Sequence, residues 1–117
     1  MADIYIMELY FDDMPDAICL QTEGIINCET LADFRDKLDT HLEQGKTKIL
    51  LDFENLKHIT SKGFSYLVFA CEKVKAQGGF LVLAKVQEEV MQVFETLKLT
   101  EYFNFADSDA EVSKLFC

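Results

Sequence analysis

One stretch decides the fold of this chain: residues 48–74, which read KILLDFENLKHITSKGFSYLVFACEKV. The apolar run Ile49–Phe53, interrupted only by Asp52, is short and typical of a strand covered on both faces. After a polar corner over residues 54–59, apolar residues recur at intervals of three or four, which is the period of one helix face. They are Phe64, Leu67, Val68, Cys71 and Val74. The stretch therefore predicts a buried strand, a corner and a helix whose first turn holds Ser61.

Ser61 occupies a chemically distinct place, the mouth of the predicted helix. The first backbone N–H groups of a helix have no partners within it and carry a partial positive charge. A serine there is a natural N-cap, and the turn tolerates an added anion. Two interpretations stay open on these residues alone: a serine that only caps the helix, and a hydroxyl that accepts a modifying group.

Composition narrows the class of protein. The 117 residues are 50% hydrophobic, which predicts one domain over residues 1–117 that buries about two thirds of its unfolded surface. Asp and Glu number 21 against 11 Lys and Arg, a net charge of -10. Because phosphate backbones and anionic membranes bind clustered Lys and Arg, we expect neither nucleic acid nor a membrane as partner. The charge favours protein partners that present a basic patch.

We find no targeting, metal-binding or cofactor pattern. The first residues lack a basic flank, and no apolar run approaches the ~18 residues of a membrane span, so we expect a soluble, cytoplasmic protein. The four cysteines form no Cys-x-x-Cys pair and stand at no metal-binding spacing from the two histidines. Phosphate-loop and dinucleotide motifs are missing as well. We therefore expect reduced, mostly packed thiols, no metal and no cofactor.

The rest of the chain alternates between strand and helix patterns. Further strands are predicted over residues 4–11, 17–22, 80–84 and 102–105, the first two joined by a turn that holds the only proline. Further helices are predicted over residues 28–44 with Asn27 as N-cap, over 87–97, and after a capping box of Ser108 and Glu111. We expect His41 to be solvated near a helix end. This order predicts an α/β fold, a mixed four- to five-stranded sheet with about four helices.

An enzyme is disfavoured by the position of the only candidate base. Ser61, His58 and Asp52 make a catalytic triad by residue type. However, no Gly-x-Ser-x-Gly elbow is present, and His58 falls in a connection that we expect to face solvent. We therefore predict a binding protein.

The order of elements resembles the STAS domain of bacterial anti-sigma factor antagonists. In that family a hydrophobic strand with an acidic end leads through a short connection to Asp-Ser-small-Gly at the mouth of an amphipathic helix. The matching residues here are 50–53 and 59–64. Further matches cover almost the whole chain: Glu23-Gly24, Asn27 and Thr30 before the first helix, residues 75–84 at a helix-Gly-Gly-strand junction, and residues 90–99 and 102–103.

Four residues depart from the family pattern. Thr60 stands where the family usually has Asp, and Lys62 stands where it has a small residue. Ser65 replaces the second Gly of the family pattern, and Asn27 replaces the Asp of the turn near the first helix. None of these changes alters the apolar pattern, so the fold expectation is unaffected. They bear on the partner instead, because Lys62 changes the contact surface and Thr60 supplies a second hydroxyl.

The resemblance implies a protein-binding module regulated by phosphorylation. It implies Ser61 as the phosphoacceptor, an anti-sigma factor that is also a serine kinase as the partner, and a phosphatase as a further partner. The implied partner-binding residues are Asn27, Thr30, Thr60, Lys62, Gly63, Phe64 and Ser65. The alternative is a STAS-like scaffold that has lost phosphorylation, or a homodimer, which the apolar character of both sides of the first strand favours. Binding of a small ligand at the same helix mouth has no specific residues in its support.

Overall fold

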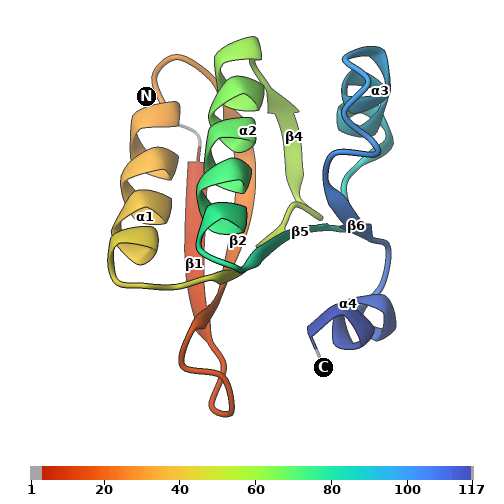
Figure 1. Ribbon diagram of the computed structural model, residues 1–117. Coiled ribbons are helices and arrows are strands. Elements are labelled where there is room, and N and C mark those ends of the chain that lie inside the picture. Colours follow the sequence, from red (N-terminus) through yellow and green to blue (C-terminus); the bar gives the residue numbers. More distant parts are fainter. Residues whose placement is uncertain (1–3, 117) are drawn as a thin grey trace.

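The computed structural model describes residues 4–116, apart from the side chain of Phe116, as an alternation of strands and helices (Figure 1). The strands are β1 (Ile4–Tyr10), β2 (Ala17–Ile26), β3 (Lys48–Asp52), β4 (Leu56–Ile59), β5 (Phe80–Ala84) and β6 (Asn104–Ala106). The helices are α1 (Leu31–Glu43), α2 (Ser61–Ala76), α3 (Glu88–Thr96) and α4 (Asp109–Phe116). The predicted α/β class and its four helices are confirmed.

The strands form one mixed sheet in the order β1-β2-β3-β5-β6, and β4 pairs with β2. β1 runs antiparallel to β2, whereas every other pair is parallel. The sixth strand is β4, which lies in the stretch predicted to be a polar corner. Only Leu56 and Ile59 of β4 are buried, so its four residues give too short an apolar pattern to reveal a strand.

β2 continues beyond its predicted end at Thr22, and this continuation pairs with β4. Gly24 has a φ of 109°, a left-handed value that glycine adopts without strain, and the register shifts between Gly24 and Ile25. Beyond the shift, Ile26 pairs with Ile59. The glycine that seemed to break the strand therefore marks a bulge, and the strand goes on to the turn before α1.

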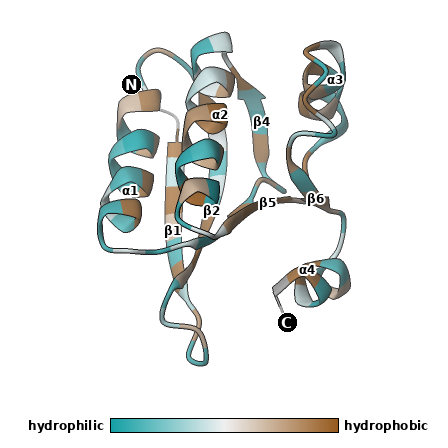
Figure 2. Ribbon diagram, viewed as in Figure 1, coloured by the Kyte–Doolittle hydropathy of each residue, from teal (hydrophilic) through white to brown (hydrophobic). Residues whose placement is uncertain are grey.

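Two apolar layers lie on opposite faces of the sheet. Side chains alternate along β2, so Ile18 and Leu20 join the large core, whereas Ala17 and Cys19 join a smaller cluster on the other face. Helices α1, α2 and α3 contribute to the large core, and α4 adds Val112 to the small cluster. In Figure 1, α1 and α2 lie side by side, with α3 towards the β6 end of the sheet. Figure 2 shows the apolar residues gathered along the central strands.

The first turns of α2 are held between α3 and α1. The ring of Phe64 meets that of Phe94 edge-on, with centroids 4.8 Å apart. Two residues further along, on the α1 side, the Tyr66 hydroxyl donates to Asp39 Oδ1 at 2.5 Å. Burial, together with this carboxylate acceptor, raises the pKa of Tyr66. Each buried aromatic ring contributes about 2–3 kcal/mol to stability, so the start of α2 is a fixed part of the core.

The expectation that His41 is solvated is wrong. Its side chain is only 3% exposed, and its Nε2 lies 2.5 Å from Oε2 of Glu8. Lys37 Nζ donates to the other oxygen of Glu8 at 2.9 Å. The hydrogen bond from Lys37 has the larger effect and that with His41 the next largest, and both lower the pKa of Glu8. Glu8 projects from β1 towards α1, so the strand covers His41. The helical periodicity of α1 could not predict this contact, because the carboxylate comes from β1, a strand far away in the sequence.

Three of the four cysteines fall within the described residues, and all three are free. Cys19 and Cys71 are buried and Cys28 is exposed, while Cys117 lies outside the described residues. Burial raises the pKa of Cys19 to about 12. Within residues 4–116 no helix is long and apolar enough to cross a membrane.

Candidate functional site

The corner between β4 and α2 holds the predicted site, and Thr60 caps the helix. Thr60 has extended backbone angles, φ -76° and ψ 167°, and its Oγ1 accepts a hydrogen bond from the N–H of Gly63 at 3.4 Å. The Thr60 carbonyl accepts the N–H of Phe64 at 3.0 Å. The interpretation of Ser61 as N-cap is therefore wrong, because the preceding threonine already satisfies that orphan N–H.

Ser61 is the first residue of α2, and its side chain is exposed. Its hydroxyl makes no hydrogen bond within residues 4–116, since the capping role belongs to Thr60. The first turn of α2 contains no acidic residue, and Lys62 adds a positive charge there. Unpaired N–H groups and the helix dipole make this end of α2 positive. The domain can thus accept an anion on Ser61 Oγ at little cost to its own stability.

A second polar turn precedes α1 and is held by reciprocal hydrogen bonds. Asn27 Oδ1 accepts the N–H groups of Glu29 and Thr30 at 2.8 and 3.0 Å. Thr30 Oγ1 in return accepts the N–H of Asn27 at 2.8 Å and donates to the carbonyl of Ile25 at 2.8 Å. Asn27 therefore closes this turn, but the prediction of Asn27 as N-cap of the helix is wrong, because α1 begins at Leu31 and its N-cap is Thr30.

Pairing of β4 with β2 brings these two turns together. The N–H of Thr60 donates to the carbonyl of Ile26 at 2.9 Å, directly before Asn27. Asn27 and Thr60 are both half-buried and follow the ends of neighbouring parallel strands. The structure thus places the turn before α1 beside the mouth of α2, as the resemblance implied.

Some of the predicted partner-binding residues are exposed and can contact a partner, whereas others are buried beneath them. Lys62 and Ser65 are exposed, whereas Thr30 is 0% and Phe64 3% exposed. Gly63 is buried, and a Cβ on it would lie 2.5 Å from Cγ2 of Ile59. Thr30 and Gly63 thus shape the site from beneath, because a partner can reach them only by displacing their neighbours.

A hollow of about 290 Å³ opens beside Ser61 on the side of α3. Its lining is mainly apolar and consists of Ser61, Phe64, Ser65, Val68, Leu97 and Leu99. Leu97 is 48% exposed and Val93, on the same side of α3, is 38% exposed. The sequence predicted a helix over residues 87–97 but not the hollow beside it. The sequence signal that could have indicated the hollow is the apolar stripe of this short helix, which is wider than the part that packs in the core.

The residues of the formal triad have other partners or none. Asp52 accepts the amide N–H of Gln21 at 3.4 Å and the backbone N–H of Glu54 at 3.1 Å. His58 is exposed on β4, and no hydrogen bond among the described residues links it to Ser61. Over residues 4–116, moreover, no three His, Cys, Asp or Glu side chains gather as a metal site would require.

The mixed sheet, with Ser61 at the mouth of α2 and a polar turn beside it, agrees with the resemblance to the STAS domain. The model of the STAS domain family matches residues 11–112, and the chain therefore belongs to this family. The relative BtrV of Bordetella bronchiseptica is named as a candidate anti-sigma factor antagonist. It is 23% identical over 110 residues, which cover 94% of this chain and 95% of BtrV.

Solved structures of low sequence identity share the fold. The protein TM1081 of Thermotoga maritima, described as a candidate anti-sigma factor antagonist, has a TM-score of 0.85 at 22% identity and covers 93% of this chain and 92% of its own. The anti-sigma factor antagonist SpoIIAA in its unphosphorylated form has a TM-score of 0.79 at 19% identity, over 95% of this chain and 96% of its own. The phosphorylated form of SpoIIAA, from Bacillus, has a TM-score of 0.73 at 18% identity, over 95% and 99%.

Proposed function

We propose that this protein is an anti-sigma factor antagonist that binds its partner while Ser61 is unmodified and is released when Ser61 is phosphorylated. The partner is an anti-sigma factor that also acts as a serine kinase, and a phosphatase would restore the binding form. The observation that carries the proposal is the exposed Ser61 hydroxyl, which is free because Thr60 caps α2. The likeness to SpoIIAA, whose structure is known with and without phosphate, supports it.

The binding surface in this proposal combines the mouth of α2 with the adjoining hollow. Lys62 and Ser65 offer polar contacts, and the hollow lined by Val68 and Leu97 takes an apolar side chain of the partner. Apolar anchors that fill a pocket usually supply most of the affinity of a protein interface. Ser61 borders this hollow, so a group attached to its oxygen lies within the contact.

Phosphorylation changes the interface far more than it changes the domain. Transfer of the γ-phosphoryl group of ATP to Ser61 Oγ forms one O–P bond, releases ADP and gives the hydroxyl proton to a base of the kinase. The phosphoserine carries about two negative charges and is strongly hydrated. The mouth of α2 stabilises that charge, whereas an apolar interface must strip its water. We therefore expect affinity to fall by about 100-fold or more, the effect of a few kcal/mol of desolvation.

The test is incubation of the protein with ATP and the serine-kinase anti-sigma factor of the same organism, followed by mass spectrometry of the peptides. We expect phosphate on Ser61, none in Ser61→Ala, and normal labelling of Ser65→Ala, which removes an exposed hydroxyl one turn along α2. Binding measured by calorimetry should survive in Ser61→Ala and be lost in Ser61→Asp. Phosphate on Thr60 would contradict the assignment of the acceptor.

The alternative is a module that binds without switching. Lys62 favours it, because a long cation at the position of a small family residue alters a kinase-binding surface. A stable complex that persists with ATP while Ser61 stays unmodified would replace the proposed switch by this constitutive binding.

A further inference from the structure

We propose that the free edge of β1 binds an extended, basic segment of a protein partner as an added strand. This surface is separate from the mouth of α2 and does not depend on the function proposed for Ser61. It combines an unpaired strand edge, a hollow with an acidic rim on one side and an exposed apolar row on the other.

The strand edge is open, and its only protective feature is the inward-facing carboxylate of Glu8. Within residues 4–116, β1 pairs only with β2, so its outer N–H and C=O groups over seven residues have no strand partner. Natural proteins protect such edges with proline, bulges or exposed lysine. β1 reads IYIMELY and has none of these. Its one charged residue, Glu8, is occupied by Lys37 and His41.

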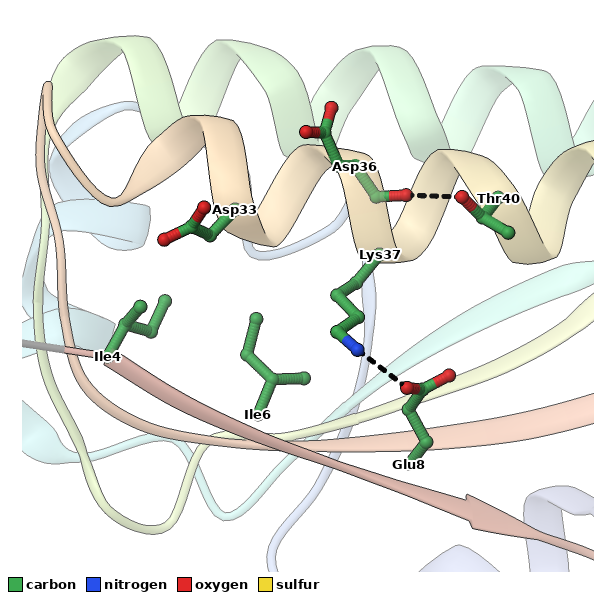
Figure 3. A pocket seen from close by; sticks show the side chains of 7 residues that line it. All are labelled: Ile4, Ile6, Glu8, Asp33, Asp36, Lys37 and Thr40. Carbon is green, nitrogen blue, oxygen red and sulfur yellow. Dashed lines mark hydrogen bonds and ion pairs between the residues drawn. The ribbon is translucent and has the colours of Figure 1, made fainter. Parts of the chain in front are cut away.

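A hollow of about 550 Å³ lies between β1 and α1 (Figure 3). Ile4 and Ile6 of β1 line it below, and Asp33, Asp36, Lys37 and Thr40 of α1 line it above. The ammonium of Lys37 is bound to Glu8, as the dashed line shows. The carboxylates of Asp33 and Asp36 make no ion pair with any residue from 4 to 116. The carboxylate of Asp36 points away from β1, so the uncompensated negative charge at the rim is that of Asp33 (Figure 3).

The opposite face of β1 carries an exposed apolar row. Tyr5 is 73% exposed, Met7 59% and Leu9 38%. These side chains alternate with Ile4, Ile6 and Glu8, which face α1. A strand paired with β1 would project its own side chains alternately into the hollow and beside this row.

These features define the chemistry of the partner. In the hollow, the aliphatic stem of a Lys or Arg side chain would pack on Ile6, and its charged end would meet Asp33. On the other face, aliphatic side chains would cover Met7 and its neighbours. The segment that fits is thus about seven residues long and alternates basic with apolar residues, and main-chain hydrogen bonds to β1 supply further affinity.

A second copy of this chain fits less well. If β1 paired with itself about Met7, Glu8 of the second copy would lie opposite Ile6, in the hollow beside Asp33. This would add a carboxylate where the rim calls for a cation. The net charge of -10 on each copy opposes the approach as well.

The test uses the labelled peptide acetyl-Arg-Val-Arg-Val-Arg-Val-Arg-amide and the full chain. We expect fluorescence polarisation to show binding, and hydrogen exchange to show slower exchange of backbone amides within residues 4–10. A peptide of the same sequence with alternate amides N-methylated should not bind, because it cannot form the ladder. Equal binding of that peptide, or protection elsewhere in the chain, would overturn the proposal.

Charge variants separate the acidic rim from the overall negative charge. Asp33→Asn should weaken binding about fivefold, the upper range for the loss of one exposed ion pair. The matched control is Glu88→Gln, which changes the net charge equally on α3, at the other end of the sheet. We expect the control and Ser61→Asp to bind within about twofold of the unmodified protein. Equal losses of binding in Asp33→Asn and Glu88→Gln would overturn the proposal. So would sedimentation that shows a dimer in which the amides of residues 4–10 are already protected.

Discussion

Replacing Gly79 by alanine tests how tightly the end of α2 is joined to the sheet. A Cβ on Gly79 would lie 1.9 Å from the carbonyl oxygen of Thr47 and 2.7 Å from its carbonyl carbon. Real Cβ contacts are essentially never shorter than 3.0 Å, so one backbone must move by about 1 Å. The same oxygen of Thr47 accepts the N–H of Phe80 at 2.9 Å, where β5 begins. The movement therefore breaks a hydrogen bond at the start of a central strand.

We expect Gly79→Ala to lower the free energy of unfolding by about 2–6 kcal/mol. Leaving a backbone group unpaired costs about 1–3 kcal/mol, and overpacking costs a similar amount. Gly78 offers a matched control, because its Cβ would meet nothing within 4 Å while its φ of +80° strains an alanine. That strain costs about 1–2 kcal/mol. Urea unfolding followed by circular dichroism measures both variants, and thermal melting should fall by about 4 °C per kcal/mol.

Gly78→Ala is the reference against which the stability of Gly79→Ala is compared. If Gly79→Ala cost no more than Gly78→Ala, the close approach to Thr47 would not limit the choice of residue. The loss of stability in both variants would then come from backbone conformation. A change in the urea m-value without a shift of the midpoint would likewise contradict a steric cause, because it reports on the denatured ensemble.

Three further predictions concern the cap, acid stability and thiol reactivity. Thr60→Ala should lower the free energy of unfolding by about 0.5–1 kcal/mol through loss of the N-cap, whereas Ser61→Ala should change it by under ~0.5 kcal/mol; urea unfolding distinguishes them, and the reverse order would refute the capping assignment. The pKa of Glu8 is lowered in the folded protein, so its ionised form stabilises the fold above the ordinary pKa of 4.5, and that contribution is lost as pH falls through the lower folded value. Unfolding between pH 3 and 7 should therefore show a smaller acid loss in Glu8→Gln, and equal losses would contradict it. Site-resolved alkylation at pH 8 should label Cys28 much faster than Cys19, whose thiol is buried and has a pKa raised to about 12; equal rates would show that the core opens readily.

Much of the fold could be predicted from local patterns, because the patterns lie in single elements. The apolar run of β3 and the three- and four-residue spacing of α2 are each complete within a few turns or residues of chain. β4 could not be found this way. Its pairing partner is the far end of β2, and only the bulge at Gly24 brings that end into register. His41 escaped prediction for the same reason, since Glu8 reaches it from a distant strand.

The site shows the same division. A hydroxyl at the start of α2 was readable from the sequence, but two adjacent hydroxyls, Thr60 and Ser61, compete for one capping position. Backbone geometry decided that Thr60 accepts the Gly63 N–H and leaves Ser61 free. The hollow between α2 and Leu97 depends on how α3 packs, so apolar periodicity alone could not reveal it.

By itself the sequence determined the class of fold, the place of α2 and the negative charge, because composition and periodicity are properties of the chain alone. Tertiary structure decided which hydroxyl is free, which turn lies beside it and which faces of β1 and α3 stay uncovered. These depend on contacts between residues far apart in the chain, and such contacts exist only once the strands have paired.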